Sequence, residues 1–216
     1  MAIKSQILII GAGGHALSVA DAALTSGMRV LGFHSPDGAI PAVSADMVRD
    51  SLANIDLSST SFALGIGANH TREDELATLL RNFPRARVAS VIHASASISP
   101  SATISEGAVI LALASVGPES TVGRGALINT GASLDHNSLL GDFASLGPGA
   151  RTGGSVLIGE RAMIGMQASV LHQLVVGSDS VIGANSLVNR TVEKNIVAWG
   201  SPAVAIRRRS RQDGYL

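Results

Sequence analysis

The chain has 216 residues with 16 basic and 16 acidic side chains, so its formal net charge is zero, and it has no cysteine. The neutral balance argues against a nucleic-acid partner, and the missing cysteine excludes disulfides, thiolate metal sites and a cysteine nucleophile. No apolar run reaches membrane-spanning length and the N-terminus lacks a signal-peptide pattern, so we expect a cytoplasmic protein without a membrane partner.

Residues 1–90 alternate between strand and helix patterns. The expected elements are strands over 7–10, 28–33, 61–66 and 87–91, a helix over 16–26 after a glycine turn, and a helix beginning at Thr71 as its cap. The first helix has Leu17, Ala20 and Leu24 on one face, and the second would bury Leu76, Leu79 and Leu80. This alternation predicts a Rossmann-like α/β domain over residues 1–90.

Residues 92–193 follow a six-residue repeat. Starting at Ile92, sixteen of seventeen positions spaced by six are Ile, Leu or Val, with Thr152 as the exception. The fifth position of each hexad is mostly Ala or Ser, and the second is often Gly. Six residues suit one short strand plus a corner, with the aliphatic side chain inward and the glycine giving the corner its backbone freedom. The pattern resembles the hexapeptide-repeat family, which implies a left-handed parallel β-helix of between five and six coils over residues 91–216.

A glycine turn, Gly11-Ala12-Gly13-Gly14-His15, stands between the first strand and the first helix. Such a turn lets a ligand approach the backbone, and the helix N-terminus offers unpaired N–H groups to a phosphate. A tight turn without a ligand is the plain alternative. NAD binding is disfavoured because no acidic residue directly follows the second strand, where only Asp37 lies nearby.

One histidine, His136, lies at the third position of a hexad in the segment Ser133-Leu134-Asp135-His136-Asn137. An imidazole can accept a proton from an attacking amine or hydroxyl, although a solvated surface histidine is an equal reading. His172 follows two coils later, about 10 Å away, which is too far for a metal shared within one chain. Histidines from two subunits remain an alternative route to a metal site.

The C-terminal segment after the hexads reads as a loop that covers the open end of the solenoid. It begins Val197-Ala198-Trp199-Gly200-Ser201-Pro202-Ala203 and continues into Arg207, Arg208 and Arg209. These arginines offer charge to the phosphates of a bound nucleotide.

The ordered combination of these motifs resembles the sialic acid O-acetyltransferase and bacillosamine or perosamine N-acetyltransferase group. The resemblance covers the GAGGHA turn, the strand end Gly65-Ile66-Gly67-Ala68-Asn69, the segment INTGASLDH and the closing GSPA. It implies a homotrimer that transfers acetyl from acetyl-CoA to a sugar amine or hydroxyl, with no metal and a nucleotide-sugar acceptor bound by residues 1–90.

The resemblance also implies site residues. His136 matches the catalytic base, with Asn137 beside it. The positions that match the acetyl-CoA site are Asn129, Gly154, Ala184, Gly200 and Pro202. The positions expected on the acceptor side are Gly11, Gly13, Gly14, His15, Asp37, Gly67 and Asn69.

Two departures from this group bear on the reaction. Asn137 stands where N-acetylating members commonly have an acidic residue, which would make His136 more basic. Ser35-Pro36 replaces an acidic pair that contacts the nucleotide, which argues against UDP recognition and leaves GDP sugars, dTDP sugars and a non-nucleotide acceptor open. We expect N-acetylation of a 4-amino nucleotide sugar, with sugar O-acetylation and a non-catalytic nucleotide-sugar-binding scaffold as alternatives.

Overall fold

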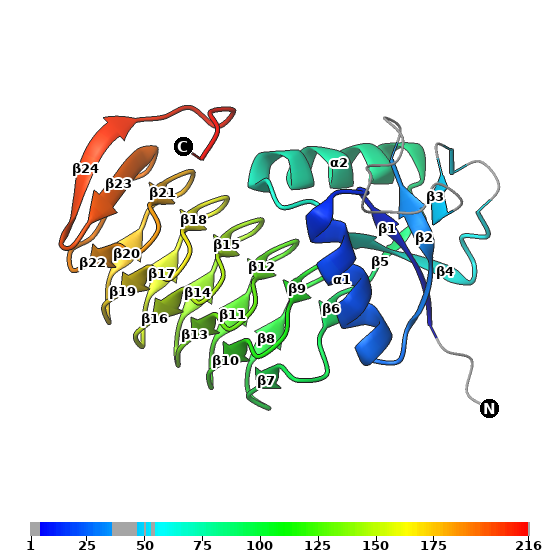
Figure 1. Ribbon diagram of the computed structural model, residues 1–216, viewed down its shortest axis with the longest axis horizontal. Coiled ribbons are helices and arrows are strands. Elements are labelled where there is room, and N and C mark those ends of the chain that lie inside the picture. The colour runs from blue at the N-terminus through cyan, green and yellow to red at the C-terminus, as the bar shows by residue number, and fades with distance from the viewer. Residues whose placement is uncertain (1–4, 36–46, 50, 53–54, 216) are drawn as a thin grey trace.

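The computed structural model describes residues 5–35, 47–49, 51–52 and 55–215. An α/β unit lies beside the first coils of a β-helix, and a hairpin covers the far end of that helix (Figure 1). None of the helices in these residues is long and apolar enough to cross a membrane.

The α/β unit is a five-stranded parallel sheet with the strand order β3-β2-β1-β4-β5. Its elements are β1 (Gln6–Ile10), α1 (Gly14–Thr25), β2 (Arg29–His34), β3 (Val48–Arg49), β4 (Thr60–Leu64), α2 (Asn69–Asn82) and β5 (Arg87–Val88).

The two helices cover opposite faces of this sheet because side chains of a strand alternate between faces. Ile7 and Ile9 of β1 pack with the buried alanines of α1. Leu8 and Ile10 pack with the buried leucines of α2. The Rossmann-like prediction is therefore confirmed, although the leucine face assigned to α1 is wrong: Leu17 is 37% exposed, and small residues form the buried side.

Helix α2 begins two residues before the predicted start. Ala68 occupies the N-cap position and supplies no side-chain hydrogen bond, so the prediction of a Thr71 cap is wrong. Leu76 and Leu79 are buried as predicted, and Arg72 is buried with them on the same face. The strand predicted over 87–91 divides in two, since β5 closes the first sheet and the next strand joins the β-helix.

The β-helix consists of three parallel faces, whose strands pair with residues 18 positions further along the chain, as Leu127 does with Ser145. The strands of the first face are β6 (Val91–Ile92), β9 (Val109–Ile110), β12 (Leu127–Ile128), β15 (Ser145–Leu146), β18 (Met163–Ile164) and β21 (Val181–Ile182). The strands of the second face are β7 (Ser97–Ile98), β10 (Ser115–Val116), β13 (Ser133–Leu134), β16 (Arg151–Thr152), β19 (Ser169–Val170) and β22 (Leu187–Val188). The strands of the third face are β8 (Thr103–Ile104), β11 (Thr121–Val122), β14 (Leu139–Leu140), β17 (Leu157–Ile158) and β20 (Val175–Val176).

The interior of the β-helix is a column of aliphatic residues from the first hexad position and small residues from the fifth. Ile128, Leu134 and Leu140 are fully buried. Two antiparallel strands, β23 (Ile196–Gly200) and β24 (Ala203–Arg208), continue the first face and form the terminal hairpin. The predicted β-helix and its terminal cap are thus present.

The corners of the β-helix correct the role predicted for glycine. Positive φ occurs at the fourth hexad position, at every sixth residue from Gly107 to Asn185, and most residues there are not glycine. The second-position glycines instead lie against the backbone of the next coil. A Cβ at Gly141 would be 2.8 Å from the amide nitrogen of Glu160, and one at Gly117 would be 2.6 Å from that of His136. These glycines are required by coil stacking.

Candidate functional site

His136 lies on the second corner, which joins the second and third faces between β13 and β14. Its side chain is exposed, and its Nδ1 is 2.9 Å from Oδ1 of Asn137. Because an amide oxygen can only accept, this contact places the proton on Nδ1 and leaves Nε2 as the nitrogen that can accept one. Asp135 is occupied elsewhere, since its carboxylate accepts the backbone N–H of His136 at 2.7 Å.

Gly154 lies directly above His136, one coil further along the same corner. A Cβ at Gly154 would be 2.3 Å from both Cε1 and Nε2 of the imidazole. Glycine at this position therefore makes room for the ring of His136. Asn137 has φ of +56°, a left-handed conformation that asparagine tolerates better than most residues. His136, Asn137 and Gly154 thus form one local cluster.

Asn129 and Ala184 lie on the first corner, between the first and second faces, and so across the second face from His136. Backbone hydrogen bonds connect the coils of this corner from Gly131 to Asn185. The outer surface of the second face carries a groove of about 540 Å³, whose walls include Ser133, Asp135 and Thr152. In one chain, Asn129 and Ala184 therefore lie across this face from His136, whereas Gly154 stacks on its imidazole.

The glycine turn at the start of α1 is open to solvent. Gly13 and Gly14 are exposed, and a Cβ on either would meet nothing within 4 Å. Gly11 differs, because it has φ of +101° and a Cβ there would be 3.0 Å from the carbonyl oxygen of Gly65. The fold itself requires Gly11, whereas Gly13 and Gly14 leave an open helix N-terminus that suits an anionic group. Asp37 lies outside the described residues.

His15 follows this turn and is half-buried beside Gly67, where a Cβ would be 3.9 Å from the Cβ of His15. Burial, and secondarily the charge of Arg72, lower the pKa of His15 to about 4. Its Nε2 is buried and has no hydrogen-bond partner among the described residues. The neutral imidazole thus has an unsatisfied nitrogen next to the open turn.

Asn69 and Arg72 join the α/β unit to the β-helix. The amide of Asn69 donates to the carbonyl oxygens of Arg161 and Ala162 and accepts from Ser145 Oγ at 2.6 Å. Asn69 is 1% exposed, so its polar atoms serve this junction and are not available to a substrate in this arrangement.

The guanidinium of Arg72 is fully buried and donates to five carbonyl or side-chain oxygens besides Ser145. These acceptors are the carbonyls of Ile66, Gly67, Gly125 and Phe143 and Oδ1 of Asn69. Burial lowers the pKa of Arg72 to about 10, so the group remains charged at neutral pH. Arg72 precedes Leu76 and Leu79 at four- and seven-residue spacing, which is the signal that could have revealed it as a buried residue.

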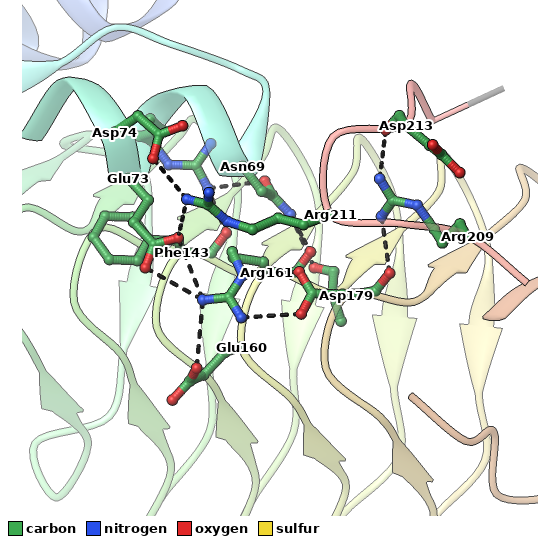
Figure 2. A network of polar contacts seen from close by, with 12 residues as sticks. Asn69, Glu73, Asp74, Phe143, Glu160, Arg161, Asp179, Arg209, Arg211 and Asp213 are labelled. Carbon is green, nitrogen blue, oxygen red and sulfur yellow. Dashed lines mark hydrogen bonds and ion pairs between the residues drawn. The ribbon is translucent and has the colours of Figure 1, made fainter. Parts of the chain in front are cut away.

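An ion-pair network extends this junction along the third corner, between the third and first faces (Figure 2). Arg161 binds both carboxylate oxygens of Asp179, at 2.8 and 3.0 Å, and also contacts Glu73 of α2 at 3.2 Å. These acidic partners raise the pKa of Arg161 above its ordinary value. Arg161 and Asp179 share the fourth hexad position one coil apart, but the hexad pattern does not specify a residue type there, so it does not indicate the ion pair.

The cap hairpin places Gly200 and Pro202 on the exposed surface, and the amide N–H of Gly200 donates to Ser186 Oγ at 3.1 Å. The arginines that follow are not a uniform basic patch. Arg209 is 7% exposed and bound to backbone carbonyls, whereas Arg208 is exposed. Over the described part of the chain, no three His, Cys, Asp or Glu side chains are grouped so that they could hold a metal.

Two protein-family models match the chain. The PglD N-terminal domain matches residues 6–79, and the bacterial transferase hexapeptide model of six repeats matches residues 155–190. The structure of PerB from Caulobacter crescentus, in complex with CoA and GDP-perosamine, is 33% identical with a TM-score of 0.85 and covers 94% of this chain and 97% of its own. The chain belongs to the hexapeptide-repeat family of sugar N-acetyltransferases.

Two further structures share this architecture. The acetyltransferase domain of PglB from Neisseria gonorrhoeae, in complex with acetyl coenzyme A, is 28% identical with a TM-score of 0.86 and covers 94% of this chain and 100% of its own. WeeI from Acinetobacter baumannii is 19% identical with a TM-score of 0.81 and covers 93% of this chain and 99% of its own. At this identity it supports the fold alone. A comparison with curated protein sequences finds no significant match. Membership of this family fixes the β-helix as left-handed.

Proposed function

We propose that this protein transfers the acetyl group of acetyl-CoA to the amino group of a nucleotide-linked sugar. The observation that carries the proposal is the His136 cluster, an exposed imidazole oriented by Asn137 and given its space by Gly154. The family relationship supplies the reaction class, because PerB was solved with CoA and GDP-perosamine. Cytoplasmic acetyl-CoA and sugar nucleotides would be its substrates.

His136 acts in this proposal as the general base. As the sugar amine attacks the thioester carbonyl, a C–N bond forms and the amine proton passes to Nε2 of His136. The C–S bond then breaks, and the protonated His136 returns this proton to the leaving thiolate of CoA. Asn137 keeps Nδ1 protonated through its 2.9 Å contact, so that the basic nitrogen is the one presented to the substrate. Direct transfer needs no acyl-enzyme, in keeping with a chain that has no cysteine.

We assign acceptor binding to residues 1–90 and acetyl-CoA binding to the β-helix over residues 91–216. The open turn at Gly13 and Gly14 and the unsatisfied Nε2 of His15 support a polar, anionic acceptor at the α1 N-terminus. On the β-helix, the proposed acetyl-CoA contacts are Asn129, Gly154, Ala184, Gly200 and Pro202. We assign structural roles to Asn69, which joins the α/β unit to the β-helix, and to Gly11, which the glycine turn requires.

We propose that three chains assemble and that the acetyl-CoA site lies between neighbours. The support is an exposed apolar row on the third face, beside the His136 corner. Leu139, Leu157 and Val175 are in register there and are each more than a third exposed. A neighbouring chain would remove this row from water. The proposal predicts a particle mass in solution near three times 21.9 kDa.

The experiment that tests this function is thiol release from acetyl-CoA against a panel of acceptors. The panel holds GDP-, UDP- and dTDP-linked 4-amino sugars together with the corresponding 4-hydroxy sugars, and mass spectrometry distinguishes amide from ester products. An amide product from one amino sugar supports the proposal. Turnover of hydroxy sugars alone would replace it with O-acetylation, for which Asn137 is the favouring observation. Acceptor binding without acetyl-CoA binding would indicate a scaffold.

A further inference from the structure

The last residues of the chain form a strap that returns from the cap hairpin to α2. We call residues Arg209–Tyr215 the C-terminal strap; Figure 1 shows it leaving β24 toward the N-terminal unit. One contact fixes its start on the β-helix, because Arg209 donates to the carbonyl oxygen of Asp179 at 2.9 Å. Arg209 also donates to the carbonyl oxygen of Asp213, within the strap, at 2.5 Å. The carboxylate of Asp213 accepts from Ser210 at 2.6 Å and closes the turn.

The far end of the strap completes the N-terminus of α2. The backbone N–H of Asn69 donates to the hydroxyl of Tyr215 at 2.5 Å, across 146 positions of sequence. Ala68, at the N-cap, has no side chain that could satisfy this group. Burial raises the pKa of Tyr215 above its ordinary value, so its hydroxyl stays neutral and can accept the bond.

Ion pairs hold the strap along the first turns of α2. Arg211 contacts Glu73 at 2.9 Å and Asp74 at 2.7 Å (Figure 2). Glu73 also binds Arg161 of the β-helix at 3.2 Å, so a single carboxylate holds the strap and the third corner together. Arg209 lies 5.9 Å from the ring centre of Tyr215, where a cation–π contact orients the phenol.

Three successive hydrogen bonds lead from the strap, through Asn69 and Arg72, to the carbonyls of residues 66 and 67 beside the glycine turn. Tyr215 binds Asn69, and Oδ1 of Asn69 accepts from Arg72 at 3.0 Å. Arg72 in turn donates to the carbonyls of Ile66 and Gly67, each at 3.0 Å. Gly67 lies against His15, whose unsatisfied Nε2 is next to the open glycine turn.

We propose that the C-terminal strap fixes the loop of residues 65–69 in place, with Tyr215 and Arg211 as positioning residues for acceptor binding. The inference rests on the proposed function for its kinetic consequence, whereas the clamp itself is independent of any substrate. Neither residue touches the His136 corner. Loosening the strap should therefore weaken acceptor binding and leave acetyl-CoA binding unchanged.

The test compares Tyr215→Phe and Arg211→Gln with Arg208→Gln, an exposed arginine of β24 outside the strap. Amide hydrogen exchange on the full chain, without ligands, measures the clamp directly. We expect Tyr215→Phe to speed exchange roughly 3- to 10-fold in peptides covering 65–72, because it removes one helix-capping bond and keeps the ring. Exchange in the coils around His136 should not change, and Arg208→Gln should match the native chain. Unchanged exchange at 65–72 in both strap variants would overturn the inference.

Kinetics with the best acceptor of the panel provide the second measurement. The acceptor KM should rise several-fold in both strap variants, with the acetyl-CoA KM and kcat within about two-fold of the native values. If exchange at 65–72 increases and the acceptor KM does not, the positioning role is refuted. If the native chain acetylates no acceptor, the proposed function fails, and the exchange result still decides whether the clamp exists.

Discussion

At the scale of single residues, two neighbours define the surroundings of the His136 imidazole. The imidazole hydrogen-bonds to Asn137, and Gly154 leaves space for the ring because it has no Cβ. The requirement at position 154 is steric, because a Cβ would occupy the place of the ring. His136 can respond by rotating outward, since it is exposed.

Gly154→Ala should therefore impair catalysis far more than stability. We expect kcat to fall at least roughly 10-fold, as a misplaced base loses most of its contribution, with little change in melting temperature. The control is the same substitution in a His136→Ala background, where it should have no further effect on residual turnover. An additive loss in the double variant would show that Gly154 acts on something other than His136.

His15 makes a prediction about stability and pH. Its pKa is about 4 in the fold against 6.5 ordinarily, so the unfolded chain binds a proton more readily between these values. The contribution of neutral His15 to the free energy of unfolding is complete above pH 6.5. It is lost as the pH falls towards 4, by up to about 3 kcal/mol. The free energy of unfolding, measured with urea across this pH range, should depend less steeply on pH in His15→Gln than in the native chain. The same pH dependence in both chains would mean that His15 is not kept neutral by burial.

At the scale of elements, the β-helix depends on two kinds of corner glycine with different physical roles. Gly141 lies under the backbone of the next coil, whereas Gly131 has φ of +66° and open space around it. Gly141→Ala should cost about 3 kcal/mol through backbone overlap. Gly131→Ala should cost about 1 kcal/mol through its left-handed conformation alone. Equal losses in urea unfolding would contradict this distinction.

The hexad pattern was sufficient to predict the β-helix because each coil repeats the same inward side chain, and periodicity survives in sequence. It did not reveal which position carries the turn. The left-handed residues include Leu113, Glu119 and Phe143, none of which is a residue type that favours positive φ. Glycine instead occupies the second hexad position, where neighbouring coils approach most closely. The backbone of the next coil that requires it is seen only in the folded structure.

The candidate site was only partly visible in the sequence, for a related reason. His136, Asn137 and Gly154 come together because positions 18 apart stack. Asn69 was expected to face the substrate, yet its amide joins the two units, since its partners come from coils more than 70 positions away. Tyr215 had no local signal at all, because its partner, Asn69, lies 146 positions earlier in the chain.

At the scale of the whole molecule, Arg72 is the group on which the two units are joined. Arg72→Met should leave the carbonyls of Gly125 and Phe143 buried without donors, at a cost of about 3 kcal/mol or more. Arg72→Lys should recover little of this loss, because a single ammonium cannot reach the acceptors that the planar guanidinium contacts. Calorimetric unfolding measures the loss of stability in both variants. Full recovery by lysine would indicate that charge alone matters at this position.

The turnover of acetyl-CoA by His136→Ala and His172→Ala shows directly whether His136 is the general base. Both histidines are exposed at the same position of the second corner, two coils apart, so the second variant is a matched control. At saturating acetyl-CoA and acceptor, we predict a loss of roughly 100-fold or more for His136→Ala and near-native turnover for His172→Ala. Comparable turnover in the two variants would contradict the assignment of His136 as the base.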